Sequence, residues 1–133
     1  MTSKVTYLGD LRTSSIHLQS GSEIISDAPL DNNGKGEAFS PTDTVANALA
    51  TCMFTIMGIK ARDLDVDLTA STASVTKIMN AEPRKIGTIE ITFDMDVAVD
   101  DKTKVILERA AMTCPVFLSL HPDIEKKISF NWK

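Results

Sequence analysis

The sequence predicts an α+β fold in which two main helices lie on one side of a mostly antiparallel β-sheet. Short stretches of alternating or β-branched residues, typical of strands, are separated by turn signals rich in Gly, Asn, Asp and Pro. Two longer stretches have the apolar spacing of helices. The predicted elements follow one another in the order β-β-β-α-β-β-α-β. This order favours helices segregated from strands over the alternating pattern of a parallel nucleotide-binding sheet.

The first forty residues predict three short strands, at residues 4–8, 14–19 and 23–26. Turn signals lie between them, at Gly9-Asp10 and Ser20-Gly21. We therefore expect a β-meander at the start of the chain.

A long surface loop is expected at residues 27–39, which are rich in Gly, Asn, Asp and Pro. Long loops inside compact domains often carry functional residues. The Gly cluster within this loop lacks a preceding strand and the spacing of a phosphate cradle, which argues against a nucleotide site.

The first helix is expected to begin after Ser40. Ser40 and Asp43 form an S-x-x-D cap, and Pro41 occupies the first helical position, where its missing N–H costs nothing. Apolar residues then recur at three- and four-residue spacing as far as Ile59, and Cys52 lies inside this apolar stripe.

Two long strands, at residues 65–78 and 86–97, are predicted from their β-branched content and from alternating apolar residues. A turn at residues 80–84 joins them. Residues 124–132 alternate in the same way and predict a closing strand.

The second helix is expected at residues 101–112, with Asp100 as its cap. Proline disfavours the helical conformation of the preceding residue, so this helix ends at Cys114. Pro115 can start a further short helix through Leu120, which places Cys114 at a helix N-terminus.

Length and composition indicate one domain over residues 1–133, with 43% hydrophobic and 24% charged residues. The net charge is −4, and no run of Lys or Arg predicts binding to nucleic acid or anionic lipid. The N-terminus has no apolar signal core, and the longest apolar stretch is interrupted by polar residues and is shorter than about 20 residues. We therefore expect a cytoplasmic protein with no membrane partner.

Cys52 and Cys114 are the two cysteines, and a reducing cytoplasm predicts free thiols rather than a permanent disulfide. A cysteine in the middle of an apolar helix stripe, such as Cys52, is most often a small core residue. Cys114 is better placed for reactivity, because a helix N-terminus stabilises a thiolate by about 0.3–1 kcal/mol. Two histidines and two cysteines without C-x-x-C or H-x-x-x-H spacing predict no metal site, and no cofactor is expected.

Several segments together resemble one known family. They are GEAFSPTD at residues 36–43, ALATCM at 48–53, EPRKI at 82–86 and AAMTCPV at 110–116. In this order they are similar to the OsmC/Ohr family, the osmotically inducible and organic hydroperoxide resistance proteins, over nearly the whole chain. The resemblance implies the OsmC-like fold and an intertwined homodimer with two sites at its interface.

The resemblance also implies a thiol peroxidase that acts on organic hydroperoxides or hydrogen peroxide. By position, Cys52 attacks the peroxide and Cys114 resolves the product, and a small or protein-bound dithiol regenerates the thiols. The family uses an arginine from the N-terminal strands to hold the attacking cysteine as a thiolate. Arg12 is the only candidate before the first helix, although its sequence context also fits a solvated turn residue.

One position departs from the family pattern. A glutamate near the start of the cysteine helix normally orients the arginine, but Thr42 occupies that position here and forms no charge-assisted pair with a guanidinium. Asp43 and Glu37 are the candidate replacements, and Asp43 is also explained as a helix-capping acid. The alternative function is a non-enzymatic OsmC-like stress or binding protein with redox-sensing or vestigial thiols. The loss of the glutamate favours this alternative, whereas retention of both cysteines favours the peroxidase.

Overall fold

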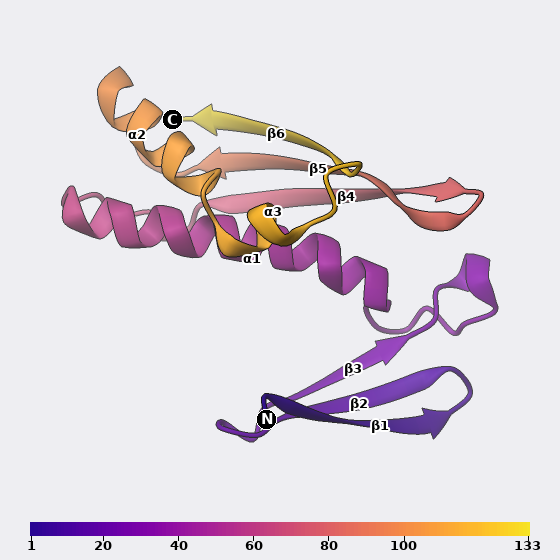
Figure 1. The fold of residues 1–133 in the computed structure, drawn as a ribbon. Helices are drawn as coiled ribbons and strands as arrows, with labels where there is room; N and C mark the ends of the chain where they lie inside the picture. The colour runs from indigo at the N-terminus through magenta and orange to yellow at the C-terminus, as the bar shows by residue number, and fades with distance from the viewer. The chain divides into compact units, whose positions relative to one another are not determined.

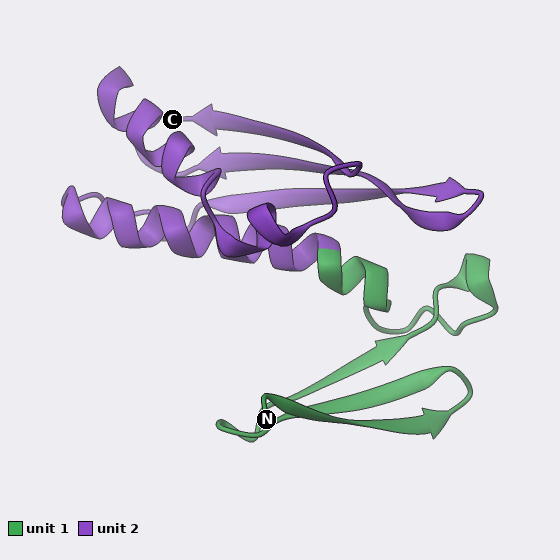
Figure 2. Cartoon of the chain, viewed as in Figure 1, with its two compact units in different colours: residues 1–45 green, residues 46–133 purple.

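The computed structural model describes residues 1–133, which divide into two compact units, Met1–Val45 and Ala46–Lys133 (Figure 2). The α+β class predicted from the sequence is confirmed, but the strands form two three-stranded sheets rather than a single sheet. The chain length predicts a single domain over residues 1–133, and this stays a prediction.

The first unit contains the predicted β-meander. Its strands are β1 (Ser3–Gly9), β2 (Arg12–His17) and β3 (Glu23–Asp27), which pair antiparallel in the order β1-β2-β3 (Figure 1). A 3-10 helix, η1 (Leu30–Asn32), follows in the predicted loop. The first turn is shorter than expected, so Arg12 is the first residue of β2 and not a turn residue.

A two-residue turn explains this early start of β2. Gly9 pairs with Arg12, and the two residues between them, Asp10 and Leu11, have φ angles of 51° and 62°. Positive φ at both central positions is typical of the tight hairpin turns whose twist matches that of the flanking strands. The Tyr7 hydroxyl accepts a hydrogen bond from the Leu11 N–H at 3.3 Å, across the same turn.

The second unit contains a three-stranded sheet and the helices. The helices are α1 (Pro41–Asp63), of which the first five residues belong to the first unit, α2 (Asp101–Ala111) and α3 (Pro115–Ser119). The strands are β4 (Thr72–Ala81), β5 (Arg84–Met95) and β6 (Glu125–Trp132), in the order β4-β5-β6. β4 and β5 form the predicted antiparallel hairpin, whereas β6 runs parallel to β5. The helices α2 and α3 form the crossover connection that a parallel pair requires.

The core of the second unit lies between α1 and the sheet (Figure 1). Leu49, Met53 and Met57 of α1 are completely buried, as is Phe93 of β5. The Phe54 ring meets the Phe93 ring edge to face, with 4.8 Å between their centroids. This packing fixes one side of α1 against the sheet and holds Cys52 at the border of the core.

Helix α1 begins as its sequence predicts. The Ser40 N–H donates to Asp43 Oδ2 at 3.0 Å, and the Asp43 N–H donates to Ser40 Oγ at 3.0 Å, which is a reciprocal capping box. With 23 residues and a mean hydropathy of 1.3 in its most apolar window, α1 is long and apolar enough to cross a membrane by composition alone. Core helices of soluble proteins have the same composition, and the buried residues of α1 pack into the core described above.

The prediction that a strand begins at residue 65 is wrong for the residues before Thr72. Residues 64–71 lie outside any strand, with turns at residues 64–65 and 69–70 and left-handed φ angles of 57° at Asp65 and 72° at Ala70. Asp67 Oδ1 accepts the Thr69 N–H at 2.9 Å. Such local side-chain bonds offer the backbone an alternative to a strand ladder, and they delay β4 until Thr72.

Candidate active site

The two cysteines form a thiol pair in the second unit. Cys52 lies in the middle of α1 and is half-buried, whereas Cys114 precedes α3 and is completely buried. Both are free thiols and both pack against the same apolar core. The Cys114 thiol is close enough to Cys52 for a side-chain hydrogen bond and a charge interaction between the two groups. A helix residue and a residue 62 positions later in the sequence are thus brought into near-contact.

Cys114 occupies the helix N-terminus that the sequence predicts. It has an extended backbone conformation, with φ −65° and ψ 143°, and Pro115 is the first helical residue. The Phe117 N–H donates to Cys114 Sγ at 3.2 Å, so the sulfur caps the helix.

Burial outweighs this helix-terminal stabilisation of the Cys114 thiolate. Removal from water raises the pKa of Cys114 above the usual thiol value, the Phe117 N–H lowers it, and the neighbouring Cys52 raises it further. Cys114 is therefore a protonated thiol at neutral pH. The more accessible Cys52 is the better candidate for first attack on a substrate, with Cys114 beside it as a second thiol.

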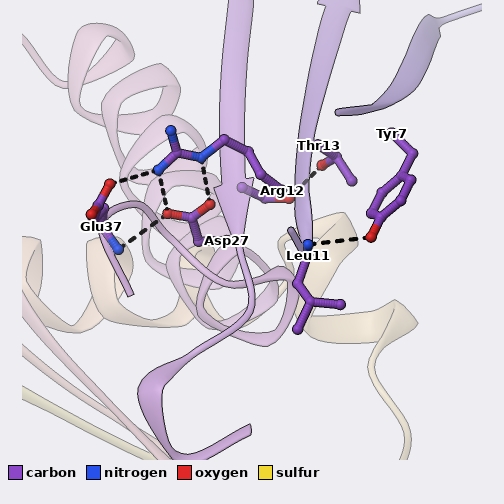
Figure 3. A network of polar contacts seen from close by, with 7 residues as sticks. Tyr7, Leu11, Arg12, Thr13, Asp27 and Glu37 are labelled. Atoms are coloured by element: carbon purple, nitrogen blue, oxygen red, sulfur yellow. Dashed lines mark hydrogen bonds and ion pairs between the residues drawn. The ribbon is translucent and has the colours of Figure 1, made fainter. Parts of the chain in front are cut away.

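Arg12 belongs to a separate polar cluster in the first unit (Figure 3). Its Nε donates to Asp27 Oδ1 at 2.7 Å, and its Nη2 donates to Asp27 Oδ2 at 2.8 Å. The same Nη2 donates to Glu37 Oε2 at 2.9 Å. The guanidinium is thus paired with two carboxylates, and it is not the solvated turn group that its sequence context also allowed.

Asp27 is the residue of this cluster that the sequence analysis missed. It was assigned to the surface loop, whereas it is the last residue of β3 and lies directly opposite Arg12 in the register of β2 and β3. The predicted elements carried no signal for this pair. The turn predicted at Ser20-Gly21 is shorter than the observed connection from His17 to Glu23, and the register that places Asp27 opposite Arg12 depends on that connection.

The candidate replacements for the missing glutamate have different surroundings. Glu37 contacts Arg12 as described, whereas Asp43 forms the capping box with Ser40 at the start of α1. The Thr42 hydroxyl lies 3.3 Å from Ser40 Oγ in the same helix start. The structure therefore brings Glu37 and Arg12 together, and it adds Asp27 to them.

The ion pair shifts the titration of Asp27. Hydrogen bonding to Arg12 lowers the pKa of Asp27 below its usual value, against the opposing effect of burial, and the Arg12 charge lowers it further. Because the folded pKa lies below the unfolded one, this carboxylate stabilises the fold above the unfolded value of about 3.9. Its contribution is lost as the pH falls through the lower, folded value.

Replacing Asp27 by Asn should therefore change how stability depends on pH. We expect Asp27→Asn to be less stable than wild type at pH 7, and the difference should narrow once the pH falls below about 4. Urea denaturation at a series of pH values measures this. Glu37→Gln is the matched control, because it removes an exposed carboxylate from the same guanidinium and should change stability little. A wild-type advantage over Asp27→Asn that stays constant from pH 7 to pH 3 would contradict the assignment.

Comparison with known proteins gives a consistent result. Residues 34–129 match the profile of the OsmC-like protein family. A search of curated protein sequences gave no match. A crystal structure from Psychrobacter arcticus 273-4, of a protein named for osmotic stress induction and a detoxification response, is 57% identical and has a TM-score of 0.96. The match covers 98% of this chain and 96% of the Psychrobacter chain.

More distant solved structures share the fold alone. An OsmC-like protein from Mycoplasma pneumoniae is 14% identical, with a TM-score of 0.81 and coverage of 98% and 94% of the two chains. An organic hydroperoxide resistance protein from Elizabethkingia anophelis is 13% identical, with a TM-score of 0.75 and coverage of 100% and 97%.

Proposed function

Since the chain belongs to the OsmC-like protein family, we propose that it is a thiol peroxidase that reduces organic hydroperoxides through Cys52 and Cys114. The observation that carries this proposal is the near-contact between the two free thiols, one half-buried and one buried and protonated. A peroxidatic cysteine needs a second thiol within reach, because its oxidised product must be captured before it is oxidised further.

The proposed reaction has three steps. The Cys52 thiolate attacks the outer oxygen of the hydroperoxide, the O–O bond breaks, and an alkoxide leaves and takes up a proton to become the alcohol. The Cys114 thiol then attacks the Cys52 sulfenic acid, which forms a disulfide and releases water. A small or protein-bound dithiol reduces the disulfide and becomes a disulfide itself. The net reaction converts one hydroperoxide and one dithiol into one alcohol, one water and one oxidised reductant.

Arg12 is proposed to hold Cys52 as a thiolate and to donate an N–H to the peroxide oxygen. The guanidinium is planar and permanently charged, and it offers several N–H donors in fixed directions. Its two parallel bonds to Asp27 support a role that needs a defined donor direction.

Apolar groups near the thiols support organic hydroperoxides as the substrate class. Val116 and Phe117 of α3 pack against the same core as Cys52, so an alkyl or aryl group has apolar neighbours close to the thiol pair. Hydrogen peroxide remains a second, smaller substrate in this proposal. A reducing cytoplasm would supply the dithiol that the cycle requires.

We also propose that the protein functions as a homodimer. The sheet of the first unit exposes large apolar side chains, among them Val5, Tyr7 and Ile24, which are 60–64% exposed in the single chain. Val5 and Tyr7 lie on one face of β1, and Ile24 lies in the same cross-strand row as Val5, with Ser15 of β2 between them. Exposed apolar side chains that gather on one face are typical of protein interfaces. Light scattering should give twice the chain mass of 14.5 kDa, and a single-chain mass at micromolar concentration would contradict the dimer.

The test of the proposed function is catalytic turnover by the purified protein. With dithiothreitol or dihydrolipoamide as reductant, we expect many equivalents of cumene or tert-butyl hydroperoxide to be consumed per chain, and hydrogen peroxide more slowly. Absence of turnover with every peroxide, while the dithiol still reduces the oxidised protein, would favour the non-enzymatic alternative. The replacement of the family glutamate by Thr42 is the sequence feature that favours that outcome.

A further inference from the structure

Asp27 holds one edge of the Arg12 guanidinium with both of its carboxylate oxygens. The two bonds, Nε to Oδ1 at 2.7 Å and Nη2 to Oδ2 at 2.8 Å, run side by side between directly opposite residues of β2 and β3 (Figure 3). Two parallel N–H to oxygen bonds fix the plane of the guanidinium as well as its position.

The Asp27 carboxylate is itself firmly held. Only 1% of the residue is exposed, and its backbone N–H donates to the Phe39 carbonyl at 3.1 Å. Its Oδ2 also accepts the Glu37 backbone N–H at 3.1 Å. Asp27 therefore connects β2, β3 and the loop that follows β3, and it provides a fixed anchor for Arg12.

Glu37 is a weaker partner of the same guanidinium. Its side chain is 67% exposed, and it bonds Nη2 at 2.9 Å. Exposed ion pairs contribute little, because water and salt screen them and two flexible side chains must be ordered. Of the two carboxylates, Asp27 is the one that determines where Arg12 points.

The bonds to the two carboxylates leave one nitrogen of Arg12 outside the ion pairs. An arginine has five N–H donors. The bonds described here involve Nε and Nη2, so the two N–H groups of Nη1 face neither carboxylate (Figure 3).

The net charge of the cluster is negative when all three groups are ionised, because two carboxylates face a single guanidinium. The cluster can therefore favour a thiolate through the direction of its free donors rather than through its overall charge.

We propose that Asp27 is the positioning residue for Arg12, a strand-borne replacement for the carboxylate that Thr42 has displaced from the start of α1. The inference rests on the proposed function, in which Arg12 assists the reaction of Cys52. It assigns the orienting role to Asp27 and not to Asp43, and it makes Glu37 an accessory partner.

The experiment compares five proteins, namely wild type, Asp27→Asn, Glu37→Gln, Arg12→Ala and the double variant Asp27→Asn/Arg12→Ala. For each, we would measure the rate of Cys52 alkylation by iodoacetamide, located by peptide mass, and the rate of cumene hydroperoxide reduction. Both rates would be followed from about pH 6 to pH 9, across the range in which thiols titrate.

We expect Asp27→Asn to slow both rates about tenfold or more at neutral pH, because a misdirected donor loses its advantage in orientation. Glu37→Gln removes the same charge from the same guanidinium nitrogen, and it should leave the rates within about twofold of wild type or slightly faster. The double variant should equal Arg12→Ala, because Asp27 acts only through Arg12. The comparison of the double variant with Arg12→Ala can be made even if Asp27→Asn lowers the stability of the protein.

Equal effects of Asp27→Asn and Glu37→Gln would overturn the inference, because they would show that only charge matters. A double variant slower than Arg12→Ala would also overturn it, since Asp27 would then act independently of the arginine. If Arg12→Ala alone leaves both rates unchanged, the proposed role of the arginine and this inference fail together. If alkylation depends on Arg12 and Asp27 but no peroxide is consumed, the proposed function fails alone.

Discussion

Cys52→Ser should abolish peroxide consumption, whereas Cys114→Ser should retain a first turnover at close to the wild-type rate. Serine is not ionised at neutral pH and is a far weaker nucleophile than a thiolate, so no first step remains without Cys52. In Cys114→Ser the Cys52 sulfenic acid forms but has no second thiol to capture it. Excess peroxide should then convert it to sulfinic acid. Single-turnover peroxide loss, followed by mass analysis of the Cys52 peptide, measures both outcomes.

The two variants must differ for the assignment to hold. Cys114 is completely buried and its pKa is raised by burial, so it is poorly suited to be the first nucleophile. Equal single-turnover rates in the two variants would contradict the assignment of Cys52 as the attacking cysteine. A faster first turnover in Cys52→Ser than in Cys114→Ser would show that Cys114 attacks the peroxide instead. Dimedone, a cyclic 1,3-diketone whose carbon nucleophile forms a stable thioether with a sulfenic acid, should label Cys114→Ser after one equivalent of peroxide and leave Cys52→Ser unlabelled.

Arg12→Ala is expected to slow peroxide attack by roughly 10²-fold at neutral pH, which is the usual loss when one aligned donor to a developing anion is removed. Without the guanidinium, the alkylation of Cys52 should accelerate only at higher pH, and much of the lost rate should return as the pH increases. Arg12→Lys should restore only part of the rate, because a point charge lacks the planar fork of donors.

The control for Arg12 is the pH profile rather than the rate at a single pH. An inert structural role would change stability but leave the profile of Cys52 alkylation where it is in wild type. Identical profiles in wild type and in Arg12→Ala would mean that the activating cation lies elsewhere, and the non-enzymatic alternative would gain support.

Local signals in the sequence were sufficient for the elements that carry the thiols. The capping box of Ser40 and Asp43 set the start of α1, and Pro115 set the helix start at Cys114. Both depend on a few neighbouring residues, which is why they could be predicted without a fold. The near-contact of Cys52 and Cys114 was expected only from family resemblance, because it joins distant segments.

Other features depend on pairing between segments and were not predicted from the sequence. The partnership of Arg12 and Asp27 follows from strand register, and an aspartate after a short strand looks like an ordinary loop residue. The parallel direction of β6 depends on how the crossover packs, which alternation alone does not reveal. The turns before β4 were missed because the prediction relied on β-branched content. It did not take into account that the Asp67 side chain can accept the Thr69 N–H and so favour a turn.

Thiol counting after one equivalent of cumene hydroperoxide tests the central claim most directly. The wild-type protein should lose both thiols of each chain, and peptide mass analysis should find a disulfide between Cys52 and Cys114 of the same chain. A product in which Cys52 is oxidised while Cys114 remains a free thiol would contradict the account.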